Sequence, residues 1–141
     1  MARIDEFLEY YRRVPLFAAC SKKDLRMVAA HAEKVHAEAG RALTTEGESG
    51  REFFMVVEGN GVVTRNGRRV GKVGPGDAFG ELALLDGGIR NATVVAQTPM
   101  ELLVLTRPSF VKMLDDAPGF ATALLRGVAR RLQDSDTTVG D

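Results

Sequence analysis

The sequence predicts a mainly β domain: a β-roll of the double-stranded, jelly-roll-like kind with helices at both ends. Three observations lead to it. Twelve of the 15 glycines lie between Gly40 and Gly88, and glycine marks tight turns between short strands. Short apolar runs bounded by turn residues fill the same stretch. Apolar residues at helical spacing are confined to the two ends of the chain.

Composition limits the classes of protein that fit. The 141 residues suit a single domain, and 19 basic against 19 acidic residues give a formal charge of zero. A net charge of zero argues against non-specific binding to nucleic acid or anionic lipid. Cys20 is the only cysteine, so we expect neither an internal disulfide nor a cysteine metal cluster. No apolar run is long enough to span a membrane and the N-terminus lacks a signal-like apolar core, so we expect a cytoplasmic protein.

Two helices are expected in residues 1–34. Apolar residues at i, i+3, i+4 and i+7 form one stripe in the first helix, and Pro15 ends that pattern. Ser21 is placed to cap the second helix, with Asp24 three residues later as its partner in a capping box.

The β-roll is expected over residues 35–106. Asn66-Gly67 between two apolar runs predicts a hairpin, because a type I′ turn needs a positive φ at both positions. We expect the runs at 93–96 and 101–105 to form a second pair of strands around Pro99.

Two C-terminal helices are expected over residues 107–134, followed by a polar tail at 135–141. Pro108 suits a first helical turn, and Pro118 either breaks this helix or starts the next. Apolar residues four apart from Phe120 to Leu132 form the stripe of the last helix.

The stretch from Gly76 to Val94 does not follow the pattern of short apolar strands separated by turns. A short helix after Gly80 would present backbone N–H groups, which bind anions, and Arg90 could add a bidentate contact to a phosphate. Glu81 accepts hydrogen bonds and therefore suits a hydroxyl of the same ligand. This combination describes a sugar-phosphate pocket. On the residues alone, a solvent-exposed glutamate and arginine without a ligand remain the simpler interpretation.

The run Phe79-Gly80-Glu81-Leu82-Ala83-Leu84-Leu85, followed after a loop by Arg90-Asn91-Ala92-Thr93-Val94, resembles the phosphate-binding cassette of cyclic nucleotide-binding domains. We place the cassette at residues 79–93. The resemblance implies a β-roll in the order of elements described above, and a single domain over residues 1–141. It also implies a non-enzymatic sensor of a cyclic mononucleotide.

The resemblance carries roles to individual residues. Glu81 would accept a hydrogen bond from the ribose 2′-hydroxyl and Arg90 would pair with the cyclic phosphate. Backbone N–H groups of Gly80, Leu82 and Ala92 would complete the site. Asn91 departs from the family pattern: it lacks the hydroxyl associated with guanine, so we expect cyclic AMP rather than cyclic GMP. Thr93 has a hydroxyl near this position, although a strand residue is the simpler interpretation.

The C-terminal helix would cover the base. Ser135 falls where a relative has a hydroxyl residue near adenine, but a frayed polar tail explains it equally well. The expected mechanism is a ligand-induced repacking of the C-terminal helices through Phe79, Leu82 and Leu85.

The remaining features indicate no other chemistry. The residues form no catalytic or metal-binding motif, no cofactor is expected, and His31 and His36 are interpreted as solvated polar residues. Direct DNA binding is not expected, because the chain ends where an appended helix-turn-helix would begin. Output would pass through an unknown protein partner or through self-association along the C-terminal helix. Two alternatives stay open: a ligand-free interaction module, and a regulatory partner of a transcription factor that lacks its own DNA-binding domain.

Overall fold

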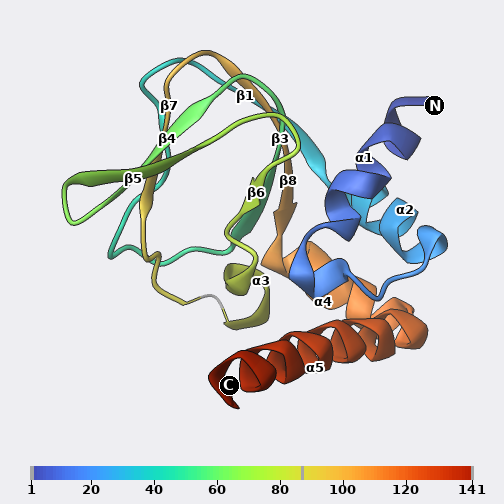
Figure 1. The fold of residues 1–141 in the computed structure, drawn as a ribbon. Helices are drawn as coiled ribbons and strands as arrows, with labels where there is room; N and C mark the ends of the chain where they lie inside the picture. The colour runs from blue at the N-terminus through green and yellow to red at the C-terminus, as the bar shows by residue number, and fades with distance from the viewer. Residues whose placement is uncertain (1, 87, 141) are drawn as a thin grey trace. The chain divides into compact units, whose positions relative to one another are not determined.

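The computed structural model describes residues 2–86 and 88–140, with the side chains of 7–81, 83–86 and 88–133. The chain divides into two compact units. One consists of the two chain ends, up to Ala30 and from Val111 onward, and the other is His31–Phe110. The first is helical and the second contains all the described strands, which confirms the predicted order of helices, β-roll and helices (Figure 1).

The helical unit begins with α1 (Ala2–Arg12), the 3₁₀ turn η1 (Pro15–Phe17) and α2 (Lys22–His31). The predicted capping box at α2 is present: the Asp24 N–H donates to the Ser21 hydroxyl oxygen, and the Ser21 N–H donates to the Asp24 carboxylate, each at 3.1 Å. The two bonds satisfy orphan donors and fix where the helix starts.

The C-terminal part of the chain forms α4 (Arg107–Asp116) and α5 (Pro118–Gly140), so Pro118 starts a helix. Phe120 of α5 stacks on Phe17 of η1 with their centroids 6.4 Å apart. At Gly127, a Cβ would approach the carbonyl oxygen of Pro15 to 3.0 Å, so the absence of a side chain lets α5 lie close to η1.

One boundary prediction at this end is wrong. The predicted separation of a helix ending at residue 134 from a tail at 135–141 fails, because α5 continues to Gly140. No proline or glycine lies between Gly127 and Gly140, so nothing in that stretch interrupts the helical backbone. The side chain of Ser135 lies outside the described residues.

The β unit consists of two four-stranded antiparallel sheets (Figure 1). The first has the order β1 (Glu33–Ala37), β8 (Met100–Thr106), β3 (Glu52–Glu58) and β6 (Ala78–Phe79). The second has the order β2 (Ala42–Thr44), β7 (Thr93–Ala96), β4 (Gly61–Arg65) and β5 (Arg68–Val73). The predicted β-roll is confirmed, with its first strand starting two residues before Val35.

The predicted β4–β5 hairpin is present, and its turn residues Asn66 and Gly67 have φ angles of 54° and 76°. The predicted pairing of residues 93–96 with 101–105 is wrong, because β7 and β8 belong to different sheets. The N–H groups of Gln97 and Thr98 both donate to the carbonyl oxygen of Asn60, which holds the chain where it passes from one sheet to the other.

The core of the β unit lies between the two sheets. The first sheet contributes buried residues of β1, β3 and β8, and the second contributes buried residues of β5 and β7. Burial of such side chains stabilises the roll by roughly 1.5–3 kcal/mol each. No helix in the described part of the chain is long and apolar enough to cross a membrane.

Candidate functional site

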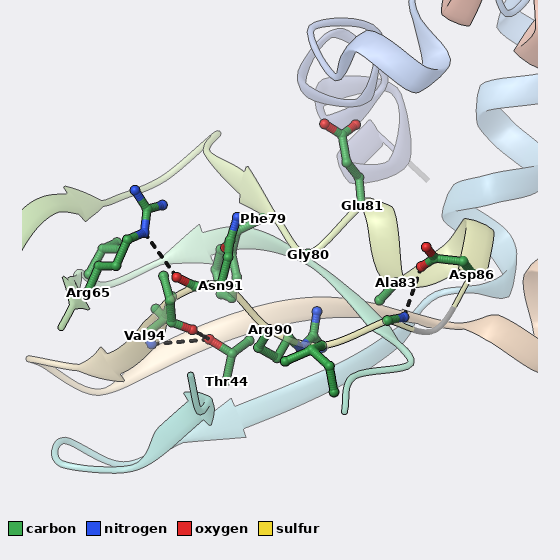
Figure 2. Close-up of a pocket in the computed structure, with 14 residues that line it drawn as sticks. Thr44, Arg65, Phe79, Gly80, Glu81, Ala83, Asp86, Arg90, Asn91 and Val94 are labelled. Atoms are coloured by element: carbon green, nitrogen blue, oxygen red, sulfur yellow. Dashed lines mark hydrogen bonds between the residues drawn. The ribbon is translucent and has the colours of Figure 1, made fainter. Parts of the chain in front are cut away.

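A pocket of about 410 Å³ opens in the β unit (Figure 2). Its walls come from β2, β4, β6 and β7, from α3 (Leu82–Asp86), and from the segments that precede and follow α3. The lining residues are Thr44, Val63, Arg65, Phe79, Gly80, Glu81, Ala83, Asp86, Gly88, Ile89, Arg90, Asn91, Ala92 and Val94. The volume lies in the range of small-molecule sites.

The short helix α3 forms where the sequence predicts it. Gly80 precedes it with a φ of 85°, which L side chains rarely adopt, and its carbonyl oxygen accepts from the N–H of Ala83 at 3.1 Å. Leu84 is buried and anchors the helix in the β unit. The apolar side of α3 is thereby fixed, and Glu81 stands at the corner where β6 meets the helix.

The backbone of Arg90 is held on both sides. Its N–H donates to the carbonyl oxygen of Glu48 at 2.8 Å, and its own carbonyl oxygen accepts from the N–H of Gly47 at 2.9 Å. The loop that carries Arg90 is therefore tied to the segment between β2 and β3.

The Arg90 side chain is held as well. Its Nη2 donates to the carbonyl oxygen of Glu52 at 2.8 Å, and its Cζ lies 5.9 Å from the centroid of the Phe54 ring. Phe54 stacks on Phe79 at 4.9 Å. Burial lowers the pKa of Arg90, and the negative charge of Glu52 partly offsets this. A guanidinium remains protonated at any physiological pH, so Arg90 provides a fixed, half-buried positive charge in the pocket.

Two glycines make room for this guanidinium. A Cβ at Gly50 would lie 1.9 Å from Nε of Arg90, and a Cβ at Gly80 would lie 2.7 Å from its Nη1. Gly80 was among the predicted site residues, whereas Gly50 was not. Gly50 lies 40 positions before Arg90 in the sequence, and no local pattern links the two.

Glu81 lines the same pocket, but its side chain does not face Arg90. Figure 2 shows the carboxylate pointing from the start of α3 away from the Arg90 side chain. The structure therefore brings Gly80 and Arg90 together directly, whereas the Glu81 carboxylate is turned away from Arg90 with its Oε2 atom buried. The amide of Leu82 lies in the first turn of α3, and its side chain lies outside the described residues.

Thr44 is a site residue that sequence reasoning missed. Its buried hydroxyl donates to the carbonyl oxygen of Ala92 at 3.0 Å and accepts from the N–H of Val94 at 3.1 Å. It fixes the backbone that follows Arg90. A threonine in a short, unpredicted strand gives no sequence signal for this role.

Arg65 was also missed. Its Nε donates to the carbonyl oxygen of Asn91 at 3.0 Å, which ties β4 to the cassette (Figure 2). Asn91 is exposed, so its side chain does not close the pocket. Thr93 uses its hydroxyl to accept from the N–H of Glu46 at 2.9 Å, a structural bond that fits a strand residue better than a ligand contact.

Other candidate chemistry is not found in the described part of the chain. No group of three or more metal-binding side chains occurs there. His36 is exposed and lies against Glu101 and Glu38. Cys20 is buried, and burial raises the pKa of its thiol to about 12, which leaves the sulfur protonated and unreactive.

The chain matches one protein family and a curated relative. Residues 34–117 match the model of the family described as "Cyclic nucleotide-binding domain". The chain is 33% identical over 129 residues to a cAMP-dependent protein kinase regulatory subunit of Schizosaccharomyces pombe, an alignment that covers 91% of this chain but 30% of the relative. The chain thus spans under a third of that curated relative's length.

Two solved structures are similar along most of the chain. The N-terminal domain of a transcriptional regulator from Streptomyces coelicolor A3(2) aligns with a TM-score of 0.82 and 38% identity, covering 91% of this chain and 95% of that one. The regulatory domain of Toxoplasma gondii PKA, co-crystallised with cAMP, aligns with a TM-score of 0.71 and 34% identity, covering 82% and 46%.

Proposed function

The chain belongs to the cyclic nucleotide-binding domain family, and on this premise we propose that its pocket binds a cyclic purine mononucleotide, cyclic AMP in preference to cyclic GMP. One observation carries the proposal. The half-buried guanidinium of Arg90 is fixed in the pocket wall between Gly50 and Gly80, where a phosphate can approach it. Relatives named for cAMP and for cGMP both match the chain, so they support a cyclic purine nucleotide, and the preference for cyclic AMP rests on Asn91, which lacks the hydroxyl associated with guanine.

We assign the remaining roles by resemblance to the phosphate-binding cassette of the family. Arg90 pairs with the cyclic phosphate, a charge-assisted contact that its permanent charge favours. Backbone N–H groups of Gly80, Leu82 and Ala92 add donors around the phosphate. Glu81 accepts from the ribose 2′-hydroxyl after a change of rotamer turns its side chain toward the ligand.

The chain acts as a regulatory binding domain rather than as a catalyst. Phosphate capture draws the cassette inward, and Phe79, Leu82 and Leu85 repack so that the C-terminal helices cover the base. The start of α4 is linked to the cassette in support of this: Nη2 of Arg107 donates to the carbonyl oxygen of Leu85 at 3.4 Å. A ligand shifts this equilibrium only by its difference in affinity for the two states.

Output passes to another chain in this proposal. Leu125 and Leu132 of α5 are 70% and 62% exposed, which supports self-association through this helix. A role beside a transcription factor is the second candidate, favoured by the 38% identity to the N-terminal domain of a transcriptional regulator. A gel shift of labelled DNA, run with and without a co-purified partner protein, separates self-association from a role beside a transcription factor.

Calorimetric titration with cyclic AMP, cyclic GMP and 5′-AMP tests the proposed ligand. We expect saturable binding of cyclic AMP, weaker binding of cyclic GMP and little response to 5′-AMP. Arg90→Ala should weaken binding by about 10- to 150-fold, because a charge-assisted contact is typically worth about 1.5–3 kcal/mol. Arg69→Ala, which removes an exposed cation outside the pocket lining, is the matched control. Failure of the folded protein to bind any of the three nucleotides would leave the ligand-free interaction module.

A further inference from the structure

The β4–β5 hairpin carries an unbalanced positive charge. Arg65, Arg68, Arg69 and Lys72 lie on it, and no acidic residue occurs between positions 59 and 76. The chain as a whole has 19 basic and 19 acidic residues, so the hairpin is a local excess in a neutral protein. A local excess of positive charge favours a negatively charged partner at that strand.

The strand β5 is also an edge of its sheet. It pairs with β4 on one side and is the last strand in the order β2-β7-β4-β5, so its second side offers backbone N–H and C=O groups. The side chains of Arg68, Arg69 and Lys72 are exposed, and Val70 among them is 54% exposed.

The charged side chains on and near the hairpin differ in whether they contact another residue. Nε of Arg65 donates to the carbonyl oxygen of Asn91, and the carboxylate of Glu46 accepts from the backbone N–H of Asn66 at the turn. The three cations of β5 make no ion pair with any residue that the structure describes. Their charge is therefore left without a counterpart along the open edge.

We propose that β5 is a docking edge for an extended, acidic segment of a partner protein, which adds to the sheet as a further strand. Main-chain hydrogen bonds would supply affinity, and the cations of β5 would supply specificity for acidic side chains. A second copy of β5 is disfavoured, because pairing two such strands sets like charges against one another. A nucleic acid is disfavoured by the zero net charge and the sequence pI of about 6.7.

The same cations should disfavour aggregation through this edge. Charged edge strands block pairing with neutral or like-charged strands, and β5 does so while it still admits an acidic one. The inference does not rest on nucleotide binding, because Arg68, Arg69 and Lys72 are not among the pocket residues.

The test uses the whole chain and two fluorescent peptides of about ten residues, the length of a long strand. One alternates Glu and Thr and the other alternates Lys and Thr. We expect anisotropy to report binding of the Glu–Thr peptide alone, weaker at about 0.5 M than at about 0.05 M salt, since screening grows with ionic strength. Amide hydrogen exchange in β5 should slow on binding, because a paired edge gains hydrogen bonds.

The triple variant Arg68→Glu, Arg69→Glu, Lys72→Glu should lose roughly tenfold or more in affinity for the Glu–Thr peptide and gain affinity for the Lys–Thr peptide. Only a folded variant can reverse its preference between the two peptides, so this result also shows that the variant folds. If the triple variant does not fold, Lys72→Glu alone is tested in its place. The matched control is Lys22→Glu, Lys23→Glu, Arg126→Glu, which reverses three exposed cations of the helical unit and should leave peptide binding unchanged.

Three outcomes would overturn the proposal. The first is no binding of the Glu–Thr peptide at low salt. The second is binding that leaves amide exchange in β5 unchanged. The third is stronger binding of a DNA duplex or of vesicles rich in phosphatidylserine than of the peptide, since either would identify a general polyanion surface instead of a strand-docking edge.

Discussion

Nη2 of Arg90 donates to the carbonyl oxygen of Glu52 at a distance of 2.8 Å. This bond positions the guanidinium between the end of β6 and the start of β3, where Gly50 and Gly80 have no side chain to displace it. The position of the proposed phosphate contact therefore depends on residues that themselves carry no charge.

We expect Gly50→Ala to weaken nucleotide binding. The new Cβ would lie 1.9 Å from Nε of Arg90, so the guanidinium must move out of its present place. Losing an aligned charge-assisted contact costs on the order of tenfold or more in affinity. Calorimetry with cyclic AMP measures the loss. Gly71→Ala is the matched control, because its Cβ meets nothing within 4 Å, and equal affinities for the two variants would contradict the prediction.

Replacement of Thr44 by valine should destabilise the roll and move the cassette. Valine keeps the shape of the side chain but leaves the carbonyl of Ala92 and the N–H of Val94 without their buried partner. We expect a loss of about 1–3 kcal/mol in the free energy of unfolding, measured by urea denaturation. Thr44→Ser retains the hydroxyl and should lose less, so a serine variant as unstable as the valine variant would assign the effect to packing.

Short sequence motifs correctly predicted the features that depend on residues close together in the chain, namely a turn and a helix start. Asn66-Gly67 specified its turn because positive φ angles at both positions suit few other residues, and Ser21 with Asp24 specified a helix start through side chains three residues apart. Both features depend on contacts within a few residues of chain.

Contacts between distant segments were not predictable in the same way. β7 pairs with β2 and β4, whereas β8 pairs with β1 and β3, and nothing in the apolar pattern of either strand encodes these partners. The place of Gly50 beside Arg90 likewise comes from the folded chain. The cassette motif predicted five residues that line the pocket, namely Gly80, Glu81, Arg90, Asn91 and Ala92, but it did not give the orientation of Glu81 that Figure 2 shows.

His36 should make stability depend on pH. It pairs across β1 and β8 with Glu101, and the hydrogen bonds to Glu101 and Glu38 raise the pKa of its imidazole above the ordinary value. A folded-state pKa above the unfolded one contributes stability that is complete below about pH 6.5 and is lost as pH rises through the folded-state pKa.

Thermal unfolding of the protein and of His36→Gln at several pH values measures this contribution. We expect the difference in Tm between the two proteins to be larger at about pH 5.5 than at about pH 8.5. The difference should shrink in a Glu101→Gln background, because the main partner is gone. A gap in Tm that stays constant with pH would show that the ion pair adds nothing.

Glu81→Gln should weaken nucleotide binding while leaving the free energy of unfolding nearly unchanged. The amide keeps the size of the side chain and an acceptor oxygen but removes the charge, and charged hydrogen bonds are about twice as strong as neutral ones. We expect a loss of roughly fivefold in affinity for cyclic AMP, with 2′-deoxy cyclic AMP affected far less, because that ligand lacks the hydroxyl that Glu81 would bind. Asp86→Asn, at another carboxylate of the pocket lining, should act equally on both ligands. If Glu81→Gln instead lowers the affinity for both ligands by the same factor, Glu81 does not contact the 2′-hydroxyl, and if it mainly lowers stability, Glu81 is a structural residue at the corner between β6 and α3.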